Sequence, residues 1–241
     1  MTVSVILPTY NEREAILPMV REVLASVPEA EVVVVDDDSP DQTWAQVEQA
    51  FMGDRRVRVL RRIGRRGLPS ALAEGLAHAK GDALVWLDAD GSMPAAVIPQ
   101  LLARLGEADA AVASRYVPGG QDDRASRLRV GTSWLINILA ASLLGWGVRD
   151  YTSGFVAVRR AVLDRVPLRT DYAYGDYCID FLYRAAQTGV RIVEIPYRCG
   201  ERRGGETKTA PDLRRFATLG FVYLGSILKL RFGLGPRRRI G

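Results

Sequence analysis

The chain has 241 residues, of which 48% are hydrophobic and 25% charged, which suits one large domain and argues against disorder throughout. The formal net charge of +5 suits a partner rich in phosphate, and this leaves nucleic acid, an anionic membrane and a phosphorylated substrate open. Cys178, Cys199 and the single histidine, His78, have no metal-ligand spacing, which argues against a zinc site or a disulfide framework.

Short apolar runs alternate with helical patterns through the first half of the chain. The runs predict strands at residues 3–8, 32–35, 57–60, 83–87 and 110–113. The helical patterns lie at residues 14–27, 43–51, 70–79 and 94–105, and Pro18 delays or bends the first helix. This alternation predicts an α/β fold with a mostly parallel sheet flanked by helices, because fully apolar strands are buried on both faces.

Polar clusters follow three of the predicted strands. Tyr10-Asn11-Glu12 follows the first strand, residues 36–38 follow the second, and Asp88-Ala89-Asp90 follows the fourth. Ligands of such sheets bind at the carboxyl ends of the strands. We therefore expect the three clusters to meet at one edge of the sheet.

Asp88 and Asp90 are the candidate metal ligands. Hard carboxylate oxygens suit Mg²⁺ or Mn²⁺, and Mg²⁺ usually shares its shell with substrate phosphates. A metal there would neutralise charge on a diphosphate leaving group. The alternative for an isolated Asp-x-Asp motif is a solvated loop, but this one directly follows an apolar strand.

Residues 36–41 place four carboxylates within six positions. Like charges so close raise one another's pKa unless something binds them. Ser39 or Asp41 capping the next helix is an alternative, although capping accounts for one residue of the run. A carboxylate here can accept hydrogen bonds from a ribose or a base.

Five segments together carry a family resemblance. In chain order they are residues 7–12 (Leu-Pro-Thr-Tyr-Asn-Glu), 35–41 (Val-Asp-Asp-Asp-Ser-Pro-Asp), 88–90, 114–116 (Ser-Arg-Tyr) and 152–155 (Thr-Ser-Gly-Phe). This set resembles the inverting family 2 glycosyltransferases with the Rossmann-like GT-A fold, and most of all the dolichol- or polyprenol-phosphate mannose synthases. The triple aspartate followed by Ser-Pro-Asp is typical of the mannose enzymes.

The resemblance implies roles for individual residues. The nucleotide would be held by Pro8, Tyr10, Glu12, Val35, Asp37, Asp88, Ala89, Asp90, Arg202 and Lys208. The metal would be held by Asp88 and Asp90, with Ser92 at a position where the family often uses glutamine. Residues 202–208 match the family's Arg-x-x-Gly-Glu-Ser-Lys segment, which closes over the donor, with Thr207 in place of the serine.

Arginines support a phosphate-bearing acceptor, because guanidinium groups bind phosphate oxygens bidentately. The resemblance points to Arg115 and Arg129 as ligands of a lipid phosphate, and with Asp88 and Asp90 they form the predicted catalytic set. A solvated basic face is the alternative, more so for Arg127. A phosphate monoester is already ionised near pH 7, so no strong general base is nominated; the role of Asp180 stays open.

Two later apolar stretches, residues 134–148 and 216–228, have basic neighbours, and the chain ends in Arg237-Arg238-Arg239. Both stretches are too short to cross a membrane, which takes about 20 apolar residues. They favour helices lying in the headgroup layer, with core packing as the alternative. We therefore expect a catalytic domain over residues 1–210, including an interfacial helix at about 130–148, and an amphipathic helix with a basic tail over residues 211–241.

The sequence thus predicts transfer of mannose from GDP-mannose to a dolichyl or polyprenyl phosphate with inversion, dependent on Mg²⁺ or Mn²⁺. A related transferase using UDP-glucose, another nucleotide sugar or a different acceptor is the alternative. No secretory signal is visible, so the predicted location is cytoplasmic, peripheral to the inner face of the membrane. A nucleic-acid partner is not expected, because basic patches interleaved with aromatic residues are lacking; the oligomeric state stays open.

Overall fold

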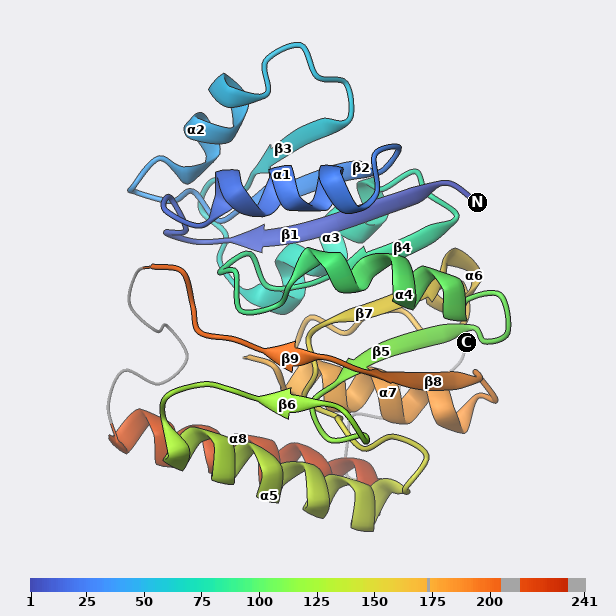
Figure 1. Cartoon of the computed structure of the whole chain (residues 1–241). Helices are drawn as coiled ribbons and strands as arrows, with labels where there is room; N and C mark the ends of the chain where they lie inside the picture. Colours follow the sequence, from blue (N-terminus) through green and yellow to red (C-terminus); the bar gives the residue numbers. More distant parts are fainter. Residues whose placement is uncertain (173, 205–212, 234–241) are drawn as a thin grey trace.

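A central seven-stranded sheet organises the chain in the computed structural model, which describes residues 1–172, 174–204 and 213–233 (Figure 1). The strand order is β3-β2-β1-β4-β7-β5-β8, and β7 is antiparallel to both neighbours while the other pairs are parallel. The strands are β1 (Val3–Thr9), β2 (Glu31–Asp36), β3 (Val57–Arg61), β4 (Ala83–Trp86), β5 (Ala110–Ser114), β7 (Val156–Arg159) and β8 (Ile192–Pro196).

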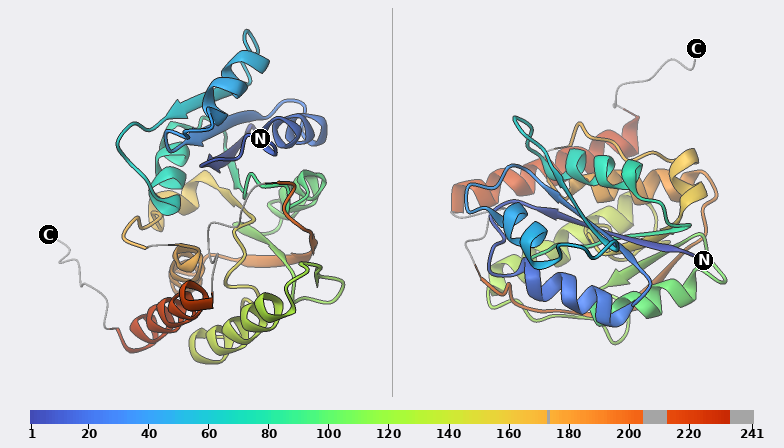
Figure 2. Two further views of the ribbon diagram at one scale, coloured as in Figure 1. Left: turned by 90° about the vertical axis from the view of Figure 1, so that its left-hand side faces the viewer. Right: turned by 90° about the horizontal axis from the view of Figure 1, so that it is seen from above.

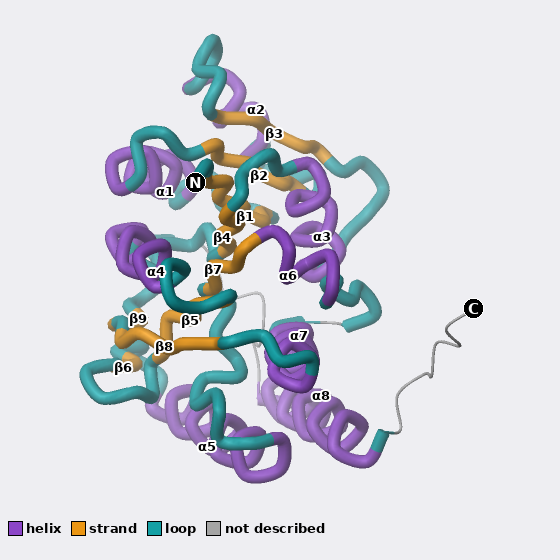
Figure 3. The backbone as a smooth tube through the Cα atoms, turned by 90° about the vertical axis from the view of Figure 1, so that its right-hand side faces the viewer, coloured by secondary structure: helices purple, strands orange, loops and turns teal. Residues whose placement is uncertain are grey.

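Helices cover both faces of this sheet (Figure 3). One face carries α1 (Ile16–Ser26), α2 (Thr43–Ala50) and α4 (Ile98–Arg104), and the other carries α3 (Leu68–His78), α6 (Arg160–Arg165) and α7 (Asp176–Gln187). Strand residues alternate between the two layers, so that Val5 and Leu7 pack against α1 while Ile6 packs against α3. Burial on both faces explains why these strands are almost wholly apolar.

Two long helices, α5 (Arg127–Leu144) and α8 (Leu213–Phe232), lie side by side beyond the β8 edge of the sheet (Figures 1 and 2). Helix α8 packs against both α5 and α7. No helix among the described residues has the length and apolar character needed to cross a membrane.

A second, two-stranded sheet joins β6 (Gln121–Asp122) to β9 (Arg198–Cys199) in parallel. It brings the loop after β5 next to the segment that follows β8. Both segments then continue toward the carboxyl ends of the central strands (Figure 1).

The predicted α/β architecture is confirmed, with differences in detail. Helix α1 begins at Ile16, so Pro18 lies in its first turn. The single helix predicted at 94–105 is a 3₁₀ turn (Ala95–Val97) followed by α4. Helix α5 begins earlier and ends earlier than the apolar stretch at 134–148, because Gly145 follows it with φ +127°.

Candidate active site

The predicted acidic pair lies in the turn after β4, in the middle of the sheet. Asp90 Oδ1 accepts hydrogen bonds from the Ser92 N–H at 3.0 Å and the Ser92 hydroxyl at 2.7 Å. Asp88 is partly buried, and none of the residues that the structure describes donates a hydrogen bond to its carboxylate. Asp90 is therefore held in place, whereas the Asp88 carboxylate keeps its oxygens for a ligand.

Burial raises the pKa of Asp88 to about 7, and the Asp90 and Glu12 carboxylates contribute in the same direction. The guanidinium groups of Arg202 and Arg115 lower this pKa and offset part of the rise. A carboxylate in this position is stabilised in its charged form by any cation that binds beside it.

This environment fits a hard divalent cation. Within residues 1–172, 174–204 and 213–233, no group of three or more His, Cys, Asp or Glu side chains is arranged to hold a metal alone. Asp88 and Asp90 supply two carboxylates, and Mg²⁺-type sites with one or two carboxylates are completed by substrate phosphates and water. The Ser92 hydroxyl bonds to Asp90, and its predicted place in the metal shell stays a prediction.

Arg202 connects the acidic pair to the loop after β1. Its Nη1 lies 3.2 Å from Asp90 Oδ2, and its Nη2 contacts both carboxylate oxygens of Glu12. Glu12 is itself buried, and its N–H donates to the Thr43 hydroxyl at 3.0 Å. The polar residues that follow β1 and β4 therefore lie close together at one edge of the sheet, as predicted.

Asp37 lies at the neighbouring strand end and is likewise bonded within the protein. Its carboxylate accepts hydrogen bonds from Arg62 Nη1 and the Gly67 N–H, both at 2.7 Å. Burial raises the pKa of Asp37, against these two donors. Beside it the Arg66 guanidinium stacks on the Tyr10 ring, 3.6 Å from the ring centroid. An aromatic face and a carboxylate here suit a nucleobase and ribose.

The run of carboxylates at 36–41 finds its partners inside the chain. Asp36 accepts from the Thr9 and Ser39 hydroxyls, both at 2.7 Å, and Asp38 from Arg61 Nε at 2.6 Å. Asp41 accepts hydrogen bonds from the N–H and the hydroxyl of Thr43, the first residue of α2. The alternative that Asp41 bonds to the start of this helix is therefore correct for that residue. Because protein groups relieve the crowding, the run does not by itself require a ligand.

Of the other residues predicted to bind the nucleotide, three lie in or beside the core and one lies outside the described part of the chain. The side chains of Val35 and Ala89 are buried in the core, Val35 against α3, so neither side chain faces the site. Pro8 is partly buried in β1, opposite Val35 in the register. Lys208 lies outside the described residues.

A cavity of about 530 Å³ opens from the acidic pair toward α5 and α8. Asp88, Asp90, Ser92 and Arg202 line one end, and Arg115, Arg124 and Arg129 also line the cavity. Helix α8 contributes Leu219, Gly220 and Tyr223, and the start of α7 with its preceding loop contributes Tyr174, Gly175 and Tyr177. The carboxylates and the arginine side chains thus line one continuous cavity.

Arg115 is buried and held by a bidentate ion pair. Its Nε and Nη2 donate to the two Asp150 oxygens at 2.8 and 2.7 Å, and Nη2 also reaches the Thr152 hydroxyl at 2.8 Å. Its Nη1 lies 3.5 Å from Asp122. Arg115 therefore brings a fixed positive charge to the cavity, with most of its N–H groups bonded to protein.

Arg129 lies in the first turn of α5 and lines the same cavity, and its role as a ligand of the acceptor phosphate stays a prediction. Arg127 does not line the cavity and is exposed. The sequence reading missed Arg124, Tyr174, Tyr177 and Tyr223. Arg124 follows a pair of aspartates in a polar loop, which carries no helical or strand period to reveal where its side chain points. Tyr174 and Tyr177 lie before and at the start of α7, and Tyr223 lies in the middle of α8, so that tertiary packing decides which of them face the cavity.

Asp180 proves to be a buried anchor away from the cavity. It accepts hydrogen bonds from Arg169, Tyr172 and Arg184, at 3.1, 3.0 and 2.7 Å. Both cysteines are free and buried, which agrees with the absence of a disulfide framework.

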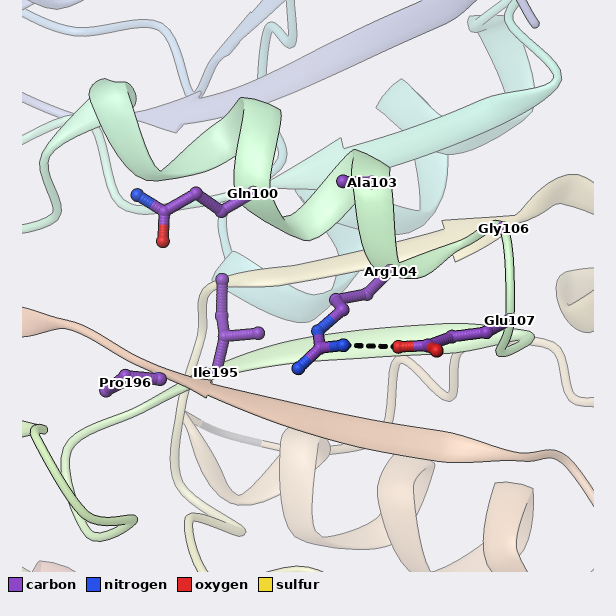
Figure 4. A pocket seen from close by; sticks show the side chains of 7 residues that line it. All are labelled: Gln100, Ala103, Arg104, Gly106, Glu107, Ile195 and Pro196. Carbon is purple, nitrogen blue, oxygen red and sulfur yellow. Dashed lines mark hydrogen bonds and ion pairs between the residues drawn. The ribbon is translucent and has the colours of Figure 1, made fainter.

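A second pocket lies apart from this cavity, between α4 and β8 (Figure 4). Its charged lining residues, Arg104 and Glu107, pair with each other. This closed pair leaves the pocket without a charged group for a ligand, and we assign it no function.

Solved structures identify the fold. Glucosyl-3-phosphoglycerate synthase from Mycobacterium tuberculosis, in complex with Mn²⁺, UDP and glucosyl-3-phosphoglycerate, superposes with a TM-score of 0.70 at 22% identity, covering 98% of this chain and 81% of that one. A mannosyltransferase from Pyrobaculum calidifontis in complex with GDP-Man and Mn²⁺ gives a TM-score of 0.60 at 19% identity, covering 99% and 76%. The fold is that of the GT-A glycosyltransferases.

Sequence comparison narrows this class to one family. The model of glycosyl transferase family 2 matches residues 4–166. The chain is 38% identical over 211 residues to a polyprenol monophosphomannose synthase of Mycolicibacterium smegmatis, covering 85% of this chain and 79% of that protein. It is 37% identical to an undecaprenyl-phosphate mannosyltransferase of Micrococcus luteus over 100% of both chains. The chain belongs to glycosyl transferase family 2.

Proposed function

We propose that the chain transfers a mannosyl group from GDP-mannose to the phosphate of a polyprenyl or dolichyl phosphate, with inversion at the anomeric carbon, at a membrane surface. The observation that carries this proposal is the single cavity that joins the acidic pair, Asp88 and Asp90, to the arginines Arg115, Arg124 and Arg129. Two phosphate-bearing substrates that react with each other need such a shared space.

The relatives support the acceptor and the sugar. The two proteins that match at 37% and 38% identity are named for mannose transfer to undecaprenyl phosphate and to a polyprenol. One of these alignments spans both chains from end to end, so it includes the segments that form the cavity wall as well as the nucleotide side. We infer the same substrate class for this chain.

The donor is expected to lie along the strand ends. Tyr10 and Asp37 suit the nucleoside, and Glu12, Arg202, Asp88 and Asp90 face the diphosphate. Mg²⁺ or Mn²⁺ held by Asp88 and Asp90 would neutralise the negative charge that develops on the leaving diphosphate. This site lies at the carboxyl ends of the strands, where such folds bind nucleotides.

The acceptor phosphate is expected at the arginine-lined part of the cavity. Its oxygen is the nucleophile and is already ionised near pH 7, so the protein needs to align it and to balance its charge rather than remove a proton. Tyr177, Tyr223 and Leu219 line the cavity from α7 and α8, where they would reduce the access of water to the donor. Exclusion of water favours transfer to lipid over hydrolysis of the donor.

Apolar side chains on the outer helices support action at a membrane. Exposed Leu128, Leu135 and Leu139 recur along α5, and exposed Phe221, Leu228 and Phe232 recur along α8 with the same spacing. Positions i, i+7 and i+11 lie on one side of a helix, so each helix carries an apolar stripe. Trp134 is also exposed on α5, beside this stripe and not on it, and Lys229 and Arg231 lie near the stripe of α8. Such helices suit the headgroup layer.

One assay tests the substrates directly. The purified chain is incubated with Mn²⁺, a panel of labelled nucleotide sugars and a short polyprenyl phosphate, and the product is extracted into organic solvent. We expect label to move only from GDP-mannose and only when the polyprenyl phosphate is present. Transfer from UDP-glucose instead, or transfer to a water-soluble acceptor alone, would reject the proposal.

A further inference from the structure

Arg124 has an unusual place in the cavity wall, because its guanidinium group is bonded along one edge and open along the other. Nε donates to Asp122 Oδ1 at 2.7 Å and Nη2 to Asp122 Oδ2 at 2.6 Å. No described residue accepts a hydrogen bond from its Nη1. The side chain is 29% exposed and lines the cavity, so a ligand there can reach it.

The ladder between β6 and β9 fixes this orientation. Gln121 N donates to Tyr197 O at 3.0 Å, and Asp123 N to Cys199 O at 2.9 Å. Side chains alternate along β6 and beyond it, so Asp122 points inward with its side chain 3% exposed, while Asp123 points outward, 42% exposed, and pairs with Arg198. The ladder therefore holds the carboxylate that aims Arg124.

Asp122 is shared between two arginines. Its Oδ2 lies 2.6 Å from Arg124 Nη2 and 3.5 Å from Arg115 Nη1. The two guanidinium groups are thus neighbours around one oxygen. Arg115 donates through Nε and Nη2 to Asp150 and Thr152, and its side chain is only 7% exposed. The Arg124 side chain is 29% exposed, so its Nη1 is the more accessible to a ligand. Neighbouring guanidinium groups suit a phosphate, whose oxygens can be bonded from several sides.

We infer that Arg124, oriented by Asp122, is a ligand of the acceptor's phosphate monoester. In this arrangement Arg124 and Arg129 contact the phosphate, and Arg115 is the fixed charge behind them. The inference rests on the proposed function, since it assigns a residue to that function's acceptor. The shared chemistry is a phosphate monoester, which inorganic phosphate also offers.

The test compares Arg124→Gln and Arg124→Lys with Arg198→Gln. Arg198 is the matched control, because it pairs with Asp123 on the opposite side of the same ladder and does not line the cavity. Initial rates are measured with GDP-mannose and a short polyprenyl phosphate, each varied in turn. Loss of a charge-assisted hydrogen bond should raise the acceptor KM by about ten-fold or more in Arg124→Gln, and the lysine should restore part of this. The donor KM should stay within about two-fold of the wild type, and Arg198→Gln should match the wild type.

Two further arms identify the ligand. Inorganic phosphate should inhibit the wild-type chain in competition with the lipid phosphate, and should inhibit Arg124→Gln about ten-fold less strongly. Vesicles of phosphatidylglycerol, a phosphodiester, should inhibit both chains equally. If the difference between the chains appears with these vesicles and not with inorganic phosphate, Arg124 binds lipid headgroups and the inference is wrong.

The kinetics separate this inference from the proposed function. A wild-type chain that binds GDP but mannosylates no polyprenyl phosphate would overturn both. An active wild type whose Arg124→Gln variant keeps its acceptor KM, or raises both KM values equally, would overturn the role of Arg124 alone. Circular dichroism and the melting temperature show whether each variant folds. Asp122→Asn, which keeps the side-chain shape, should change the acceptor KM in the same direction.

Discussion

Arg202 and Asp90 form an ion pair at the acidic end of the cavity, with Arg202 Nη1 3.2 Å from Asp90 Oδ2. The segment that carries this arginine is fixed on the acidic turn, because Arg203 N donates to Asp90 O and Gly200 N to Ser92 O, both at 2.9 Å. The guanidinium group supplies the same carboxylate with the positive charge that a metal ion would supply. A metal ion bound at Asp90 would therefore compete with Arg202, and a diphosphate would offer Arg202 an anion besides Asp90 and Glu12.

Replacing Arg202 should consequently separate metal binding from nucleotide binding. We expect Arg202→Gln to bind Mn²⁺ alone several-fold more tightly than the wild type, because a competing cation is gone, and to bind GDP more weakly when Mn²⁺ is present. Titrations followed by electron paramagnetic resonance of Mn²⁺ measure both. Arg203→Gln, whose side chain pairs with Glu22 on α1, is the neighbouring control. Equal Mn²⁺ affinity in all three chains would contradict the competition.

Asp90→Ala should reduce mannosyl transfer by at least about a thousand-fold while the chain still folds, since a metal and its electrostatic stabilisation contribute several kcal/mol to such reactions. The exposed Asp164→Ala on α6 is the control. Product formation and thermal unfolding are measured on the same preparations. Near-normal turnover in Asp90→Ala would reject the prediction that Asp90 binds the metal ion.

The pKa of Asp88 predicts an unusual pH dependence of stability. It is about 7 in the folded chain against an ordinary value of 3.8, so between these values the folded state retains a proton that the unfolded state has lost. The metal-free chain should therefore lose stability as the pH rises through this window, with no further change from this group above it. We expect the melting temperature to fall with pH more steeply in the wild type than in Asp88→Asn, and Mn²⁺ to raise it most above pH 7. If the melting temperatures of the wild type and Asp88→Asn changed in parallel with pH, Asp88 would not be the cause of the dependence.

The sequence predicts the sheet and its acidic edge well, because these depend on local patterns. Consecutive valines at 32–35 and the apolar residues at 83–87 identify buried strands from composition alone. The Asp-x-Asp motif directly follows one of these segments in the sequence, so its place at the end of a central strand can be predicted. The antiparallel β7 is different: Val156–Arg159 is short and has no turn signal that gives its direction, so only tertiary pairing with β4 and β5 reveals it.

The arginine-lined part of the cavity depends on long-range contacts, and the sequence predicts it less well. The resemblance identifies Arg115, but its pairing with Asp150 across 35 positions cannot be derived from spacing. Arg124 reaches the cavity because β6 pairs with β9, nearly 80 positions later in the chain. In the same way, the place of α8 in the cavity wall follows from its packing against α5 and α7.

Arg129 should affect the acceptor more than the donor. It lines the cavity from the first turn of α5, whereas the exposed Arg127 on the same turn does not. We expect Arg129→Ala to raise the KM for polyprenyl phosphate about ten-fold or more through loss of a charged hydrogen-bonding group, with a smaller change in the KM for GDP-mannose. Arg127→Ala should leave both KM values near those of the wild type. Equal effects of Arg129→Ala on the two substrates would argue against contact with the acceptor.

Binding to membranes should depend on the exposed apolar side chains of α5 and α8. Trp134 and Phe221 are large and exposed, and removing them takes away apolar area that the headgroup layer would cover. We expect the double variant Trp134→Ser, Phe221→Ser to sediment several-fold less with vesicles that contain phosphatidylglycerol, and higher salt to weaken the binding that remains, because cationic residues near α8 lose their attraction to the surface.

Met52 provides the matched control for this experiment. It is 87% exposed, which makes it the most exposed large apolar side chain in the part of the chain that the structure describes, and it follows α2 at the opposite end of the molecule from α5 and α8 (Figure 1). Met52→Ser should sediment with vesicles as the wild type does. A loss of binding as large as that of the double variant would mean that total exposed apolar area, and not the face formed by α5 and α8, determines attachment. Unchanged binding in the double variant would instead leave both helices as packing partners of the catalytic domain.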